Sequence, residues 1–277
     1  MKNLLFILLL CGTLPLAGMS NNDNSNAPTV AKPIDPNEAI CIHGVVPQTK
    51  PSDPPTQLAV ISPNDDLSLL SMTDFTISTM CYQRRANSIQ LYNPKELAAY
   101  FEAKKKAKPG EKIPLPQPVY DLPIQNGKYE YLLILERTKT NINEWVPRLI
   151  PDGAGDIPGN SRLMENLTDA IVRGRIVDYS SGKPNPLTTF KVAPDGETLV
   201  ALTEGTGANG LRNFWIEANK NGEEQELQNG RWNFTAQERY IIVTYTMPGF
   251  KRISVLSYLD PVPELPQPKG KTKDHLP

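Results

Sequence analysis

Few side chains in this sequence could carry out acid–base chemistry. The chain has only two histidines, His43 and His275, so imidazole groups for catalysis or metal binding are scarce. His43 lies in the apolar run A-I-C-I-H-G-V-V, which predicts a buried strand and a structural histidine. The sequence contains no nucleophile elbow, no H-E-x-x-H zinc motif and no phosphate-binding glycine loop. It therefore predicts a protein that is not an enzyme and needs no cofactor, with a secreted hydrolase as the weakest alternative.

The cysteines predict a disulfide rather than a metal or redox site. Cys11 lies in the apolar start of the chain, where lipid attachment is an alternative to removal with a leader. Cys41 and Cys81 then form an even pair, with no C-x-x-C motif and few histidines to complete a metal site. We expect a Cys41–Cys81 disulfide, which would stabilise the fold by roughly 3–4 kcal/mol.

Three further groups of residues suggest binding rather than catalysis. Asp152 and Asp156 lie in a glycine-rich loop, but two carboxylates are too few for Ca²⁺, so no metal is expected. The basic run Lys104–Lys106 suits a helix C-terminus or a docking surface for an acidic partner. Aromatic side chains can stack on sugars or fill a core, and the tryptophans open to both interpretations are Trp145, Trp215 and Trp232. Of these, Trp215 and Trp232 are the candidate interaction residues.

The ends of the chain predict export. Residues 1–20 combine Lys2, the apolar run Leu4–Leu10 and small residues, a pattern typical of a signal peptide. The apolar run is shorter than the roughly 20 residues that span a bilayer. We expect a periplasmic, outer-membrane-associated or secreted protein, which allows peripheral attachment to a membrane. A net charge of −1 argues against nucleic-acid binding.

The rest of the sequence predicts a mainly β protein. A polar leader (residues 21–38) precedes a first β-domain (39–146), a Gly- and Pro-rich linker (147–168), a second β-domain (169–260) and a Pro-rich tail (261–277). Asn93 and Pro94 predict a helix over residues 94–108, inserted in the first domain. The expected strands include residues 39–46, 58–61, 67–72, 75–80, 128–137, 213–218, 231–235, 240–246 and 252–259, with a loop or hairpin end at 219–230.

An internal duplication is also expected. The stretch Asp169–Glu204 reads as strand, turn, strand, turn and strand, and a looser copy of it begins at Ala39 and ends at Asp74. Residues 128–137 similarly match residues 238–245.

The second domain resembles the carboxypeptidase-regulatory-like domains. The residues that carry the resemblance are the strand Gly174–Asp178, the turn Ser181–Pro184, the stretch Thr206–Gly210 followed by Phe214, and the ending Pro248–Phe250. The resemblance covers about a third of the chain and implies a transthyretin-like or Ig-like β-sandwich, with a divergent copy in the first domain. Such domains are commonly non-catalytic, so the resemblance implies architecture rather than chemistry.

The sequence thus favours an exported, non-catalytic interaction or structural protein. Its expected partner is another protein in a cell-envelope or surface assembly that serves secretion, adhesion or transport. The alternative is a carbohydrate-binding accessory module with tryptophans at its site. The oligomeric state is open.

Overall fold

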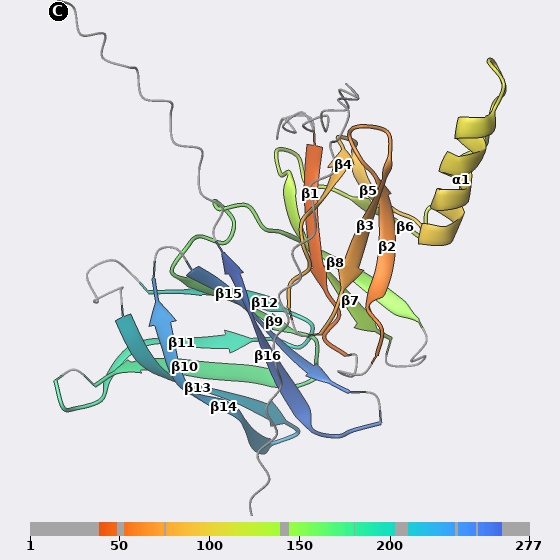
Figure 1. The fold of residues 1–277 in the computed structure, drawn as a ribbon. Coiled ribbons are helices and arrows are strands. Elements are labelled where there is room, and N and C mark those ends of the chain that lie inside the picture. Colours follow the sequence, from red (N-terminus) through yellow and green to blue (C-terminus); the bar gives the residue numbers. More distant parts are fainter. Residues whose placement is uncertain are drawn as a thin grey trace, which may run out of the picture. The chain divides into compact units, whose positions relative to one another are not determined.

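The computed structural model describes residues 39–48, 53–74, 76–138, 144–179, 181–202, 210–235, 238–247 and 249–261. The described residues are mainly β, with sixteen strands and one helix, which confirms the predicted fold class at the level of a β-sandwich type (Figure 1). The expected signal peptide and leader, and all but the first residue of the Pro-rich tail, lie outside these ranges. Within them, no helix is both long enough and apolar enough to cross a membrane.

The first half of the chain begins with a four-stranded sheet of order β4-β1-β7-β8. Its strands are β4 (Cys81–Arg84), β1 (Ala39–Val45), β7 (Glu130–Arg137) and β8 (Trp145–Pro151). β1 runs antiparallel to β4 and parallel to β7, so the first strand of the chain lies inside the sheet. All seven residues of β1 are buried, as its apolar sequence predicts.

Two hairpins cover one face of this sheet. They are formed by β2 (Thr56–Ile61) with β3 (Leu67–Met72), and β5 (Ser88–Leu91) with β6 (Tyr120–Pro123). Backbone hydrogen bonds between Ala59 and Tyr92 connect the two hairpins. Apolar side chains from the sheet and the hairpins then form one core, which includes Ile42, Leu70 and Leu133.

The single described helix, α1 (Pro94–Lys106), begins where the sequence predicts. The Asn93 side chain accepts a hydrogen bond from the backbone N–H of Lys95 at 2.9 Å, and Pro94 occupies the first turn. The helix, drawn in yellow in Figure 1, packs on the first-half strands through Leu97 and Phe101, which cluster with Ala59 of β2. The helix and the extended segment after it connect β5 to β6.

The second half repeats this arrangement of strands. A sheet of order β12-β9-β15-β16 contains a parallel pair, β9 with β15, flanked by antiparallel neighbours. Its strands are β12 (Glu197–Ala201), β9 (Ser161–Asn166), β15 (Glu238–Thr246) and β16 (Ile253–Pro261). A second sheet of order β11-β10-β13-β14 packs on it through a core that includes Val172, Phe214 and Ile242. The strands of this second sheet are β11 (Asn185–Val192), β10 (Ile171–Asp178), β13 (Gly210–Lys220) and β14 (Glu223–Phe234).

A further apolar cluster joins the two halves. It combines Leu132 and Ile134 of β7 with Leu163 of β9 and Ile241 and Val243 of β15. Each of the two sheets that contain a parallel pair is therefore buried on both faces, because its other face packs on its own hairpins or second sheet.

Gly174, the first residue of the motif that carries the family resemblance, has a packing role. A Cβ atom at this position would lie 2.1 Å from the ring of Phe190, which is directly opposite on β11. Only glycine lets the Phe190 ring lie across β10 and pack against the core of the second half.

Two details of the predicted elements are wrong. Residues 76–80 form no strand, because β4 begins only at Cys81. The predicted linker 147–168 contains most of β8 and all of β9, so that only residues 152–160 connect the halves. Residues 219–230 do include a hairpin end, as predicted, because a tight turn at Asn221 and Gly222, with positive φ at both positions, joins β13 to β14.

The predicted internal match of residues 39–74 with 169–204 is shifted by one strand relative to the equivalence that the sheet orders show. β1 corresponds in strand order to β9, whereas the match paired it with the β10 region. The match of residues 128–137 with 238–245 does pair the equivalent strands β7 and β15.

Candidate functional site

The expected disulfide is absent, and both cysteines are free and buried. The register explains this, because Cys81 is directly opposite Ile42 and Cys41 is opposite Tyr82 on the neighbouring strand. Directly opposite residues share a face of a sheet and successive residues alternate, so the two thiols point to opposite faces. Burial raises the pKa of the Cys41 thiol to about 11 and also raises the pKa of Cys81. Packing, rather than a disulfide, therefore holds the described part of the fold together.

His43 belongs to a buried ionic cluster between the two halves. Its Nε2 atom contacts Asp152 Oδ2, and Arg239 Nη2 lies 3.2 Å from the same oxygen. Arg239 also donates from Nε to Asp260 Oδ2 at 2.6 Å and from Nη1 to the carbonyl of Ile157 at 2.9 Å. Every side chain in this cluster is at most 7% exposed. The cluster joins β1 of the first half to β15 and β16 of the second.

The electrostatics of this cluster follow from its burial. Burial and the neighbouring charge of Asp152 raise the pKa of Asp260 to about 6, although Arg239 opposes both effects. Burial likewise raises the pKa of Glu130 on β7. Oδ1 of Asp152 has no hydrogen-bond partner in the described part of the protein.

One histidine and two carboxylates are close enough here to hold a metal ion in principle, since ligand atoms of His43, Asp152 and Asp260 lie within 4.8 Å of one another. The guanidinium of Arg239 already contacts both carboxylates and supplies the positive charge that a cation would bring. We therefore interpret the cluster as an ion network that joins the halves. Asp156, the other carboxylate of the same loop, instead contacts Lys128.

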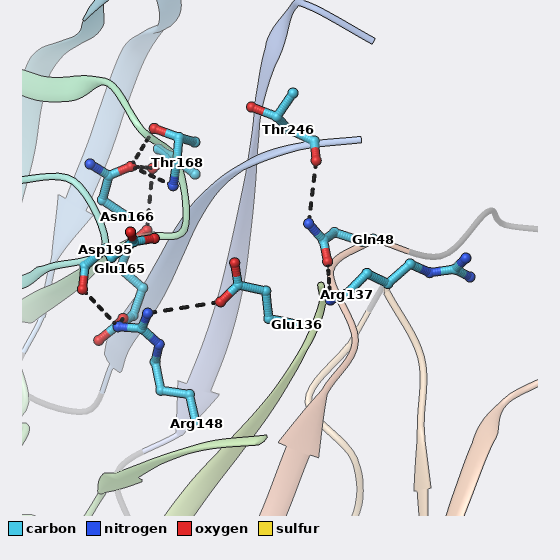
Figure 2. A network of polar contacts seen from close by, with 10 residues as sticks. Gln48, Glu136, Arg137, Arg148, Glu165, Asn166, Thr168, Asp195 and Thr246 are labelled. Atoms are coloured by element: carbon cyan, nitrogen blue, oxygen red, sulfur yellow. Dashed lines mark hydrogen bonds and ion pairs between the residues drawn. The ribbon is translucent and has the colours of Figure 1, made fainter. Parts of the chain in front are cut away.

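A second polar network surrounds Arg148 of β8 (Figure 2). Arg148 Nη1 lies 3.5 Å from Glu165 Oε2 of β9 and donates to the carbonyl of Asp195 at 3.1 Å, while Nη2 lies 3.8 Å from Glu136 Oε2 of β7. The Glu165 side chain is fully buried. Burial, together with the hydrogen bond and charge of Glu197 opposite it on β12, raises the pKa of Glu165 to about 9.

The remaining residues in Figure 2 have structural roles. Asn166 Oδ1 accepts hydrogen bonds from the Thr168 hydroxyl at 2.7 Å and the Thr244 hydroxyl at 3.0 Å. Gln48 donates from Nε2 to the carbonyl of Thr246 at 3.3 Å and accepts from the backbone N–H of Arg137. These contacts connect loops of both halves to β15.

Trp232 is a core residue, so its predicted interaction role is wrong. It is 7% exposed and stacks on Phe214 with ring centroids 3.9 Å apart. Another neighbour is the buried guanidinium of Arg162, which lies 5.7 Å from the Trp232 ring. The same guanidinium lies 4.4 Å from the ring of Phe234 and 4.2 Å from the ring of Tyr240. The sequence contains a signal for this, because Trp232 and Phe234 alternate with Arg231 and Asn233.

Trp215 lies on the opposite, outer face of the same sheet. It borders an open groove of about 490 Å³, together with Arg173 and Arg175 of β10, Thr189 and Lys191 of β11 and Glu217 of β13. The guanidinium of Arg175 lies 4.8 Å from the centre of the Trp215 ring. The alternation of Phe214, Ile216 and Ala218 with these polar positions could have identified the outward face from the sequence.

All three predicted lysines are exposed. Two of them have carboxylate neighbours, since Lys104 contacts Asp65 in the β2–β3 turn and Lys105 lies 3.1 Å from Glu102 within the helix. Beside α1 lies a second groove, of about 270 Å³. Its lining includes Ile61, Arg84, Arg85, Tyr92, Tyr100 and Leu115.

Comparisons with known proteins identify no relative. No protein-family model matches the chain, and no similar sequence is found among curated proteins. The fold and the site thus define the class only as a mainly β protein of β-sandwich type.

Proposed function

We propose that this chain is an exported, non-catalytic interaction protein built from two tandem β-sandwich domains. The equivalent strand orders, β4-β1-β7-β8 and β12-β9-β15-β16, support a duplication. The other strands support a duplication as well. In the second half β10 pairs with β13, and in the first half the Ala59–Tyr92 bridge links β2 to the end of β5 in the equivalent place. We assign the second domain to the carboxypeptidase-regulatory-like type, on the strength of Gly174 and the strand and turn that follow it.

The placement of the acid–base groups supports a non-catalytic role. His43 with Asp152, and Glu165 beside Glu197, are the arrangements that most resemble catalytic pairs. His43, Asp152 and Glu165 are buried between the halves, and none of them borders the groove beside α1 or the groove at Trp215. A substrate in either groove would not reach these groups.

The groove beside α1 is the observation on which the interaction role depends. In the second half, the two-residue turn Asn221–Gly222 joins β13 to β14, whereas α1 and the segment 107–119 join the equivalent strands β5 and β6. This insertion forms one wall of the groove through Tyr100 and Leu115, which is 42% exposed. An element that only one domain carries, and that creates an open groove, is the best candidate for a partner site.

The chemistry of this groove suits a protein segment with acidic and aliphatic side chains. Arg84 and Arg85 provide positive charge against the single carboxylate of the groove, Asp65, which contacts Lys104 and lies 3.8 Å from Arg84. Tyr92 and Tyr100 provide aromatic surface, and tyrosine and arginine are enriched at the energetic centres of protein interfaces. The signal-like residues 1–20 support a partner in a cell envelope or at a cell surface.

Site-specific photocrosslinking in the native cells tests this proposal. A photoreactive amino acid at Leu115 should form an adduct with one defined protein through an acidic segment, and the same probe at Leu199, which is 43% exposed in the other half, should not. The double variant Arg84→Glu with Arg85→Glu should reduce the adduct at least about tenfold, since it replaces two attractive charges with two repulsive ones. Lys106→Glu is the matched control and should leave the adduct unchanged. The same adducts at both positions, or none at Leu115, would refute the proposal.

A further inference from the structure

The groove at Trp215 lies in the middle of the outer face of the second-half sheet. Arg173 is directly opposite Glu217, and Arg175 is directly opposite Trp215, so the four side chains share one face of β10 and β13. On the other side, Thr189 and Lys191 of β11 are directly opposite Arg175 and Arg173. Arg173, Arg175 and Lys191 are exposed, while Trp215 and Glu217 are half-buried.

We propose that this groove binds an acidic polysaccharide, with Arg175 as the residue that recognises its carboxylate or sulfate groups. The site is independent of the groove beside α1, which lies in the first half of the chain. Three cationic side chains border the Trp215 groove against one carboxylate, so its charge complements an anionic ligand.

Trp215 restricts the conformation of the Arg175 side chain. With its guanidinium 4.8 Å from the ring centre, Arg175 is held by a cation–π contact instead of sampling many rotamers. A guanidinium held in this way can offer paired N–H groups to a planar anion at a lower entropic cost. Arg173, two residues along the same strand and roughly 7 Å away, can contact a second anionic group of the same chain.

The mixed polarity of the groove favours a sugar over a nucleic acid. Glu217 accepts hydrogen bonds, and the Thr189 hydroxyl both donates and accepts them. Sugar hydroxyls are complementary to both kinds of group. A nucleic-acid backbone carries a phosphate at every nucleotide, whereas a sugar unit can place a hydroxyl group instead of its anionic group beside the Glu217 carboxylate.

The position of the groove favours a sugar over an extended peptide. β10 and β13 are interior strands of the order β11-β10-β13-β14, so their backbone groups are already paired within the sheet. A peptide that adds to a sheet needs a free edge, and on this face its own amide groups would find side chains only. A polysaccharide has no backbone amides and is recognised through side chains alone.

Titration calorimetry on the full chain tests the proposal with defined probes. Oligogalacturonate and dextran sulfate are the acidic probes, methyl-esterified oligogalacturonate is the neutral form of the same chain, and poly-glutamate is the acidic peptide. We expect at least one acidic probe to bind, and expect its affinity to fall as salt is added. Arg175→Ala and Trp215→Ala should each weaken that binding about tenfold or more. Arg137→Ala should not change it, although Arg137 is also an arginine stacked on a tryptophan, with its guanidinium 4.7 Å from the centre of the Trp145 ring.

Each other outcome overturns the proposal. Failure of both acidic polysaccharides to bind removes the ligand class, and equal binding of the esterified chain removes the role of charge. Equal binding of poly-glutamate shows a site for acidic chains of any kind. Full binding by Arg175→Ala and Trp215→Ala places the ligand elsewhere. None of these results depends on the crosslinking at Leu115, so the two proposals can fail separately.

Discussion

The buried carboxyl group of Glu165 should make the stability of this protein depend strongly on pH. Its side chain is fully buried, and burial together with Glu197 raises its pKa from 4.5 to about 9. The folded state therefore keeps a proton at neutral pH that the unfolded state releases. For a group with a raised pKa, the stabilisation is complete below the unfolded value and is lost as pH rises toward the folded value.

The size of the effect follows from proton linkage. One proton taken up on folding changes the free energy of unfolding by about 1.4 kcal/mol per pH unit. The range from about pH 6 to about pH 8 lies between the two pKa values of Glu165, so the loss over this range should be about 3 kcal/mol. Arg148 does not abolish this loss, because its closest approach to the carboxylate is 3.5 Å and it also serves Glu136.

Glu165→Gln isolates this contribution. The amide keeps the size of the protonated carboxyl group and can still donate a hydrogen bond to Glu197, but it does not titrate. Urea unfolding of both proteins across this pH range should show the variant gaining about 3 kcal/mol relative to the natural protein. Taking the difference removes the titration of Asp260 and other groups that both proteins share. Glu136→Gln, which also changes a carboxylate beside Arg148, is the matched control and should not reproduce the gain. Parallel stability curves for Glu165→Gln and the natural protein would refute the reasoning.

Three other predictions concern packing and charge. Gly174→Ala should destabilise the protein by roughly 1–3 kcal/mol in thermal unfolding, because the new Cβ would meet the Phe190 ring. Adding Phe190→Ala should recover part of the loss. Unchanged stability of the Gly174→Ala variant would contradict the packing role. Arg239→Met should lower the free energy of unfolding by roughly 3–5 kcal/mol near neutral pH, because it leaves buried carboxylates unpaired. The loss should be smaller below the pKa of Asp260, about 6, where that carboxyl group is protonated. An equal loss at both pH values would be inconsistent with this account. A reductant should leave the melting temperature unchanged, since the two buried cysteines are free, and a marked drop would show that a disulfide forms.

The ionic clusters between the halves could not be found from the sequence. Asp152 lies 109 residues from His43 in the chain, and Arg148 meets Glu165 only because β8 and β9 lie in different sheets that face each other. Buried charges have no local pattern, because their partners lie on other strands whose placement the sequence does not give. The sequence interpretation accordingly assigned residues 147–168, which contribute to both clusters, to a linker.

The sequence by itself determined what local rules control. Short continuous apolar runs mark strands such as β7 and β15, and the side chain of Asn93 caps α1 through an amide only two residues away. These signals depend only on residues that are close together in the sequence. They therefore establish the mainly β class and the position of the helix without knowledge of the partner strands.

Only the tertiary structure decided which strands pair and in which register. A shift of one residue moves a side chain to the other face of a sheet. For this reason the two cysteines on adjacent strands point apart instead of forming a bond, and Trp232 fills the core while Trp215 faces the open groove. Register depends on the packing of whole sheets, and that packing joins residues far apart in the chain.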